Sequence, residues 1–402
     1  MNARPTRRRF LQTGCAVGGV ALAGCFEGDE SSEPDGNADG NGDGNADPIF
    51  DGASPIYHEY TQDGRYAYAT LGPAYGEGGA FVFDIETLEL EATFPDVPAN
   101  YATIAHPSAP KLYLTGGAAD TEETAPAGEW WAFDTERHEL LEHRESNGHE
   151  THGGAFTPDG EELWLINRDT GDALVIDPET DEAVAEVDYI GESPDVITMS
   201  PDGRYAYTTT RGAMPQSGPR AIRSEEPGLN VVDVHAREYV GTVQPDPETP
   251  QSDFHGIGMV PGGRDDEFEV WAVDQGTATL YVLEPTDGGA SLEIGDAVDL
   301  GDAGAETPHA VAFDSQYRYA AIPSTSGAAT RILRVDDRAV VDELETGANS
   351  HFASFTPDDG RILVDVIGAE KVVEIEADLE SESFAIDREL SLSALDPFPG
   401  GE

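Results

Sequence analysis

Four of the ten histidines in this sequence recur at one spacing together with an aspartate, and this set has the residue types of a metal site. His152, Asp195, His255, His309 and His351 follow one another at intervals of roughly 42–60 residues. Imidazole nitrogen and carboxylate oxygen are common ligands of Zn²⁺ and Cu²⁺ in proteins. Intervals this long do not form a local motif, so the five residues would meet only if the chain repeats a structural unit of that length.

Further polar residues accompany this set. His149 and Glu150 lie just ahead of His152, and we expect them to act as outer-shell partners or extra ligands. His58 is expected to approach the same site from lower in the molecule. Three basic residues are expected either to bind an anion or substrate carboxylate, or to pair with neighbouring acids. They are Arg211, Arg220 and Arg223.

The elements that would position these residues are short strands. From residue 152 onward, four alternating or apolar runs are separated by turn residues such as Pro158-Asp159-Gly160, which is typical of a four-stranded meander. The same unit recurs seven times. The units begin near residues 54, 99, 150, 193, 253, 307 and 349. Seven units of four strands predict an all-β fold, a seven-bladed β-propeller with four antiparallel strands per blade, over residues 54–402.

The propeller geometry converts one position of the repeat into one ring in space. In such a fold the inner strand of each blade lines the central channel, and its first residue lies at the channel mouth. Alignment of the seven units predicts the ring residues to be Ile56, Tyr101, His152, Asp195, His255, His309 and His351. Blade seven is expected to supply its own fourth strand around Phe384–Leu390, and Pro48–Phe50 could add an edge strand.

The repeat resembles the YVTN-type propeller repeat. The unit from Ser193-Pro194-Asp195 through Pro201-Asp202-Gly203 to Tyr205-Ala206-Tyr207 follows the pattern of that family, as does Val175-Ile176-Asp177. The resemblance extends over about residues 50–393. It implies the propeller fold but no particular activity, because such propellers include enzymes, binding proteins and scaffolds.

The first residues resemble a secretion signal. Thr6-Arg7-Arg8-Arg9-Phe10-Leu11 is similar to a twin-arginine export motif, and Leu22-Ala23-Gly24-Cys25 is similar to a lipoprotein cleavage box. We therefore expect residues 1–24 to be removed, Cys25 to carry a lipid, and the protein to be anchored to the outer face of the cytoplasmic membrane. Residues 25–53 are rich in Gly, Asp and Asn, which predicts a flexible acidic tether.

The composition restricts the partners. The formal net charge of −57 repels phosphate backbones, so the sequence excludes a nucleic-acid-binding protein and favours cationic or metal ligands. A hydrophobic content of 38% still predicts a folded core. An acid-rich, Lys-poor chain resembles the proteins of salt-accumulating halophiles, in which high salt screens repulsion.

The sequence is consistent with three functions. The first is an anchored propeller that binds Zn²⁺, Cu²⁺ or a small polar ligand at the channel mouth, as part of metal handling. The second is a metal-dependent enzyme, similar to a lactonase-like hydrolase or an oxidase, that uses the same ring. The third is a cell-surface scaffold whose outer loops bind a protein partner without chemistry. The sequence has no P-loop and no Gly-x-Ser-x-Gly motif.

Overall fold

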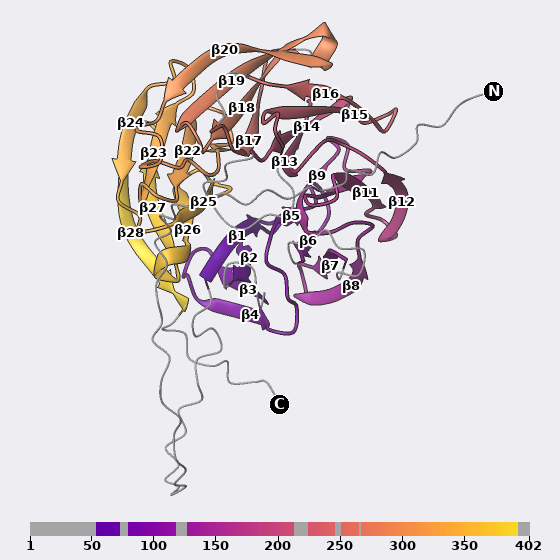
Figure 1. Cartoon of the computed structure of the whole chain (residues 1–402). Coiled ribbons are helices and arrows are strands. Elements are labelled where there is room, and N and C mark those ends of the chain that lie inside the picture. The colour runs from indigo at the N-terminus through magenta and orange to yellow at the C-terminus, as the bar shows by residue number, and fades with distance from the viewer. Residues whose placement is uncertain are drawn as a thin grey trace, which may run out of the picture. The chain divides into compact units, whose positions relative to one another are not determined.

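The computed structural model of this protein describes residues 54–72, 79–117, 127–212, 224–245, 251–264 and 267–392. These residues form seven four-stranded antiparallel sheets arranged in a ring (Figure 1). The predicted all-β seven-bladed propeller is therefore confirmed. Cys25, the signal and tether segments, and Pro48–Phe50 lie outside the described residues. Within the described ranges, no helix has the length and hydrophobicity needed to cross a membrane.

Each blade consists of four consecutive strands, of which the first is the innermost. The inner strands are β1 (Ser54–Tyr60), β5 (Thr103–Ala105), β9 (Thr151–Phe156), β13 (Pro194–Met199), β17 (Phe254–Pro261), β21 (Ala312–Phe313) and β25 (Ser350–Phe355). The second strands are β2 (Tyr66–Gly72), β6 (Lys111–Gly116), β10 (Leu163–Asn167), β14 (Tyr205–Thr210), β18 (Phe268–Asp274), β22 (Tyr319–Ser324) and β26 (Arg361–Val366).

The outer half of each blade continues the meander. The third strands are β3 (Gly79–Asp84), β7 (Glu129–Asp134), β11 (Asp172–Asp177), β15 (Leu229–Asp233), β19 (Thr279–Thr286), β23 (Ala329–Arg334) and β27 (Lys371–Asp378). The fourth strands are β4 (Leu90–Phe94), β8 (Glu139–Glu145), β12 (Glu182–Val187), β16 (Glu238–Val243), β20 (Ser291–Asp299), β24 (Val340–Leu344) and β28 (Ser383–Ser391). Two short 3₁₀ turns, η1 (Asp287–Gly289) and η2 (Ile367–Ala369), complete the described secondary structure.

The hydrophobic pattern explains the position of each strand. The apolar strand β10 is buried along its whole length, whereas the charged strand β8 is largely exposed at the rim. The Pro-Asp-Gly turns fix the first hairpin of a blade. In blade three, Thr157 Oγ1 donates to Asp159 Oδ1 at 2.7 Å, and Gly160 adopts a φ of 74°, which favours glycine. The turn therefore sets where the second strand begins.

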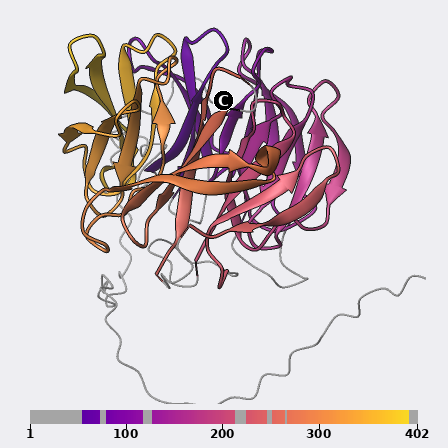
Figure 2. The same ribbon diagram turned by 90° about the horizontal axis from the view of Figure 1, so that it is seen from above.

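The ring closes by packing between blades seven and one. Core residues of the two blades form one hydrophobic cluster that includes Phe81 and Leu363. Arg361 Nη1 of blade seven donates to the main-chain oxygen of Ile85 in blade one at 2.8 Å. The expectation that blade seven supplies its own fourth strand is confirmed by β28, which pairs with β27. Figure 2 shows the same ring from its side, with the strands running between its two faces.

Candidate metal centre at the channel mouth

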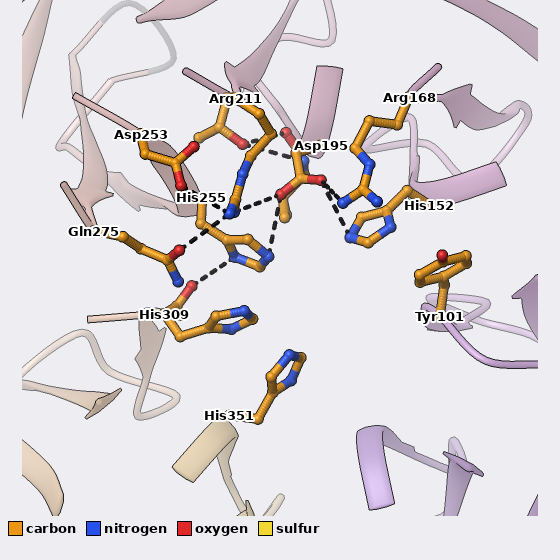
Figure 3. Close-up of polar contacts among 12 residues, drawn as sticks. Tyr101, His152, Arg168, Asp195, Arg211, Asp253, His255, Gln275, His309 and His351 are labelled. Atoms are coloured by element: carbon orange, nitrogen blue, oxygen red, sulfur yellow. Dashed lines mark hydrogen bonds and ion pairs between the residues drawn. The ribbon is translucent and has the colours of Figure 1, made fainter. Parts of the chain in front are cut away.

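Four of the ring residues occupy bulges near the start of the inner strands. His152, Asp195, His255 and His351 are each the second residue of their strand, and pairing with the neighbouring strand is interrupted at each of them. A β-bulge releases a side chain from the regular alternation of a strand and redirects it. The bulge therefore explains how residues of one repeat position turn toward a common centre (Figure 3).

The expectation that every ring residue is the first of its strand is wrong in detail. Ile56 is the third residue of β1, while Tyr101 and His309 precede β5 and β21. The reason is that β5 and β21 are short and start later than the other inner strands. The predicted ring is nevertheless largely present, because Tyr101, His152, Asp195, His255, His309 and His351 lie around one centre in Figure 3.

Three ring residues approach one another closely enough to share a metal ion. His152 Nε2 lies 3.2 Å from Asp195 Oδ1, and His255 Nε2 lies 3.1 Å from Asp195 Oδ2. The ligand atoms of the three residues all lie within 4.8 Å of one another, and all three side chains are buried. Ligands about 2.0–2.1 Å from a tetrahedral ion are about 3.3 Å apart, so each of these contacts, one to either oxygen of Asp195, has the spacing of two ligands on one ion.

The hydrogen bond of His255 Nδ1 identifies which ring nitrogen of this residue carries the proton. Its Nδ1 lies 2.7 Å from the carbonyl oxygen of His309, which can only accept a hydrogen bond, so Nδ1 carries the proton. In neutral His255 the lone pair of Nε2 then faces the Asp195 carboxylate. Two acceptors 3.1 Å apart repel each other unless a proton or a metal ion lies between them.

Burial disfavours the protonated, positively charged form of His152 and His255. Desolvation holds the pKa values of His152 and His255 well below the usual range, although the negative charge of Asp195 opposes this shift. Among the described residues, neither ring nitrogen of His152 has a hydrogen-bond partner. Neutral imidazole is the form that binds a metal. The donor set of two nitrogens and one oxygen could therefore hold a metal ion.

Two arginines hold the carboxylate in place. Arg168 Nη1 donates to Asp195 Oδ1 at 2.9 Å, and Arg211 Nη1 donates to Asp195 Oδ2 at 3.0 Å. Burial alone would raise the pKa of Asp195, but the charged guanidinium groups of Arg211 and Arg168 hold it well below its usual range. Asp195 therefore remains ionised and oriented toward both histidines, as hydrogen-bonded metal-ligating carboxylates commonly are.

The arginines are in turn paired with acids. Arg168 Nε donates to Glu150 Oε2 at 2.8 Å, while its Nη2 contacts the other carboxylate oxygen. Arg211 Nη2 donates to Asp253 Oδ2 at 3.0 Å and to Gln275 Oε1 at 3.1 Å. The result is a buried network of alternating charges across blades three to five (Figure 3). Glu150 thus contacts Asp195 only through Arg168.

His309 and His351 form a stack beside the triad. The ring centroids of His255 and His309 are 3.6 Å apart, and those of His309 and His351 are 3.7 Å apart. His351 Nδ1 lies 3.1 Å from the carbonyl oxygen of Ile56. Neither histidine belongs to the group of described residues whose ligand atoms converge, which is limited to His152, Asp195 and His255.

The remaining candidates lie apart from the triad. His58 Nδ1 is 2.8 Å from Asp365 Oδ2, and its Nε2 is 2.6 Å from Ser354 Oγ, so it belongs to a different cluster. The main-chain nitrogen of His149 donates to Thr170 Oγ1. Of the two expectations for Arg211, the structure agrees with pairing to acids and not with anion binding, because its side chain is buried and bound to the carboxylates of Asp195 and Asp253. Arg220 and Arg223 lie outside the described residues.

Sequence reasoning missed Arg168, Asp253 and Gln275, although the repeat contained a signal. Arg168, Arg211 and Gln275 each follow the second strand of their blade directly. These positions define a second polar position of the repeat. They lie outside the inner strands, which carry most of the predicted ring residues.

Comparison with known proteins supports the fold alone. No family model matches the sequence, and no curated protein matches it. Among solved structures, hydrazine synthase of Kuenenia stuttgartiensis is similar with a TM-score of 0.60 and 15% identity, covering 88% of this chain and 99% of that chain. The Cps50 (Swd1) β-propeller domain of Myceliophteria thermophila has a TM-score of 0.56 and 11% identity, with coverage of 83% and 96%. At these identities the likeness establishes propeller architecture, and function must be argued from the site.

Proposed function

We propose that this protein binds one Zn²⁺ or Cu²⁺ ion at the channel mouth through His152, Asp195 and His255, and that it acts in metal handling outside the cytoplasmic membrane. The observation that carries the proposal is the contact between His255 Nε2 and Asp195 Oδ2 at 3.1 Å. Because His255 Nδ1 carries the proton, a cation between these atoms removes their repulsion. The predicted export signal and the lipid on Cys25 supply the location in this proposal.

Long-range charge supports a cationic ligand. The formal net charge of −57 produces a negative potential that raises the local concentration of cations and lowers that of anions. Arg168 and Arg211 bring two positive charges to the site, but Glu150, Asp195 and Asp253 bring three negative charges. With neutral histidines, the network therefore has a net charge of about −1, which a divalent ion would change to about +1.

The test is elemental analysis of the protein purified in molar salt from its own host. We expect about one zinc or copper ion per chain, and loss of that ion in the double variant His152→Ala, His255→Ala. His351→Ala is the matched control, because it removes a buried ring histidine outside the triad and should retain the metal. A wild-type protein that contains no metal and binds neither added zinc nor added copper would contradict the proposal and favour a scaffold or a non-metal polar ligand.

A metal-dependent hydrolase is a second candidate, favoured by the number of ligands. Three protein ligands leave one position of a tetrahedral ion open for water or substrate, as in catalytic zinc sites. The ion would supply Lewis acidity, and Arg168 and Arg211 would keep the ligating carboxylate oriented. Turnover of lactone substrates that stops after chelation and returns with zinc would favour this candidate over metal handling. Turnover that persists after chelation would exclude it.

A further inference from the structure

A second cluster of polar side chains, formed by a serine, a histidine and an aspartate, lies at the seam between blades one and seven. His58 of β1 bridges two residues of blade seven, Asp365 of β26 and Ser354 of β25. His58 Nδ1 is 2.8 Å from Asp365 Oδ2, and His58 Nε2 is 2.6 Å from Ser354 Oγ. The order serine, imidazole, carboxylate and both distances match the arrangement that activates a serine nucleophile.

The direction of the hydrogen bonds follows from chemistry. An ionised carboxylate can only accept, so His58 donates from Nδ1 to Asp365. The Nε2 atom of the neutral ring is then an acceptor 2.6 Å from Ser354 Oγ. The one proton of this hydroxyl is directed to the Tyr60 hydroxyl oxygen in this structure and reaches Nε2 by rotation of the hydroxyl group. The carboxylate fixes the tautomer in which Nε2 acts as a base. In this state Ser354 Oγ is prepared to lose its proton to His58.

The charge distribution favours a proton on His58 after attack. Among the described residues, His58 is the one ion-pair partner of Asp365, and Asp365 Oδ1 has no hydrogen-bond partner. Both side chains are fully buried. A buried carboxylate without other compensation stabilises an imidazolium beside it strongly, because the local dielectric is low. Asp365 is therefore a positioning residue that also stabilises the charge developing on His58.

The surroundings of Ser354 indicate the class of substrate. Ser354 is partly exposed, whereas the side chains of His58 and Asp365 are buried. Ser354 Oγ donates to the Tyr60 hydroxyl oxygen at 2.8 Å, and that hydroxyl donates to the main-chain oxygen of Ser354 at 3.4 Å. Burial raises the pKa of Tyr60 well above its usual value, so this hydroxyl stays protonated. The rings of Tyr60 and Phe352 lie edge-on to His58, with centroids 5.6 and 5.3 Å away. A protonated hydroxyl and apolar walls suit an ester with a small apolar acyl group.

We propose that Ser354, His58 and Asp365 form a metal-independent site for the hydrolysis of small carboxylic esters. Ser354 Oγ bonds to the ester carbonyl carbon while its proton passes to His58 Nε2. The carbon–oxygen bond to the alcohol then breaks, and the alcohol leaves with the proton from His58. Water attacks the acyl-serine in the same way, gives its proton to His58, and releases the carboxylic acid with Ser354 restored. Tyr60 donates a hydrogen bond to the oxyanion of each intermediate.

The experiment combines covalent labelling with ester hydrolysis, in chelator and molar salt throughout, so that the metal site does not contribute. The full chain is treated with a fluorophosphonate probe and digested, and the modified serine is identified by mass spectrometry. We expect labelling at Ser354. We expect none at Ser315, an exposed serine whose Oγ contacts the carboxylate of Asp359 without an imidazole partner. Hydrolysis of p-nitrophenyl acetate should be lost in Ser354→Ala and unchanged in Ser315→Ala.

The role of Asp365 requires its own readout. Asp365→Asn should lower the labelling rate at least a hundred-fold and change the pH profile of hydrolysis, while circular dichroism remains that of the wild type. Ser354→Ala removes one hydroxyl group and decides the matter if Asp365→Asn fails to fold. Hydrolysis that persists in Ser354→Ala, or a fluorophosphonate that leaves Ser354 unmodified, would overturn the proposal and leave the cluster as a structural clasp between blades one and seven.

Discussion

His255 Nε2 lies 3.1 Å from Asp195 Oδ2, and the two side chains come from neighbouring blades. The other ring nitrogen of His255 is committed to the carbonyl oxygen of His309 at 2.7 Å. A neutral imidazole ring carries one proton, so His255 can donate a hydrogen bond to His309 or to Asp195 but not to both. This relationship underlies the metal proposal, and it distinguishes His255 from the other histidines of the ring.

The histidines of the ring should therefore differ in their effect on metal binding. His255→Ala should weaken zinc or copper binding at least a hundred-fold, because it removes one of three ligands. His309→Ala should change the affinity less than ten-fold, because His255 contacts the main-chain oxygen of His309, which the substitution retains. Isothermal titration in molar salt measures both. Equal losses in the two variants would show that the stack, and not the triad, holds the ion.

Metal binding should stabilise the fold. An ion that binds the native state alone adds about 2.7 kcal/mol when its free concentration is a hundred times the Kd. Thermal unfolding should shift upward with zinc or copper and return after EDTA treatment. The double variant His152→Ala, His255→Ala should give the same unfolding temperature with and without metal. A metal-dependent shift that survives in this variant would place the ion elsewhere.

Buried histidines should make the metal-free protein sensitive to acid. Desolvation lowers the pKa of His351 to about 4. An unfolded chain, in which the pKa is about 6.5, binds this proton at higher pH than the native state does. Stability therefore falls as the pH decreases from about 6.5 to about 4, by about 3 kcal/mol for this residue. Chemical unfolding of His351→Gln across this range should show a weaker pH dependence. Identical curves for variant and wild type would contradict the assignment.

Arg211 should be important for stability as well as for the site. Arg211→Met leaves the buried carboxylates of Asp195 and Asp253 without a shared partner, and breaking such a network costs about 3–5 kcal/mol. Arg137 is the matched control, because it pairs with Asp134 while its side chain is 65% exposed. Arg137→Met should cost at most about 1 kcal/mol. Equal effects in the two variants, measured by unfolding in denaturant, would show that the network contributes little.

The sequence predicted the fold better than the site. Turn residues such as Pro158-Asp159-Gly160 and strictly local strand patterns determine the blades, so the repeat could be read without tertiary information. The position of His152 and His255 followed from the repeat as well. Their approach to Asp195 did not, because it depends on bulges that redirect side chains and on the hydrogen bond to His309.

The arginines show why the other contacts of the candidate site could not be predicted from the sequence. From the sequence, Arg211 could either bind an anion or pair with neighbouring acids. In the structure its guanidinium group is buried, because it forms ion pairs with the buried carboxylates of Asp195 in blade four and Asp253 in blade five. The Ser354–His58–Asp365 cluster was equally inaccessible, since His58 and Asp365 are 307 positions apart and meet only where the ring closes.

X-ray absorption spectroscopy of the protein loaded with one equivalent of zinc or copper tests the central claim most directly. The account predicts nitrogen and oxygen ligands at about 2.0–2.1 Å, with the multiple-scattering signature of two imidazoles. In His255→Ala this signature should fall to one imidazole. A spectrum without imidazole, or one that His255→Ala leaves unchanged, would contradict a metal centre formed by His152, Asp195 and His255.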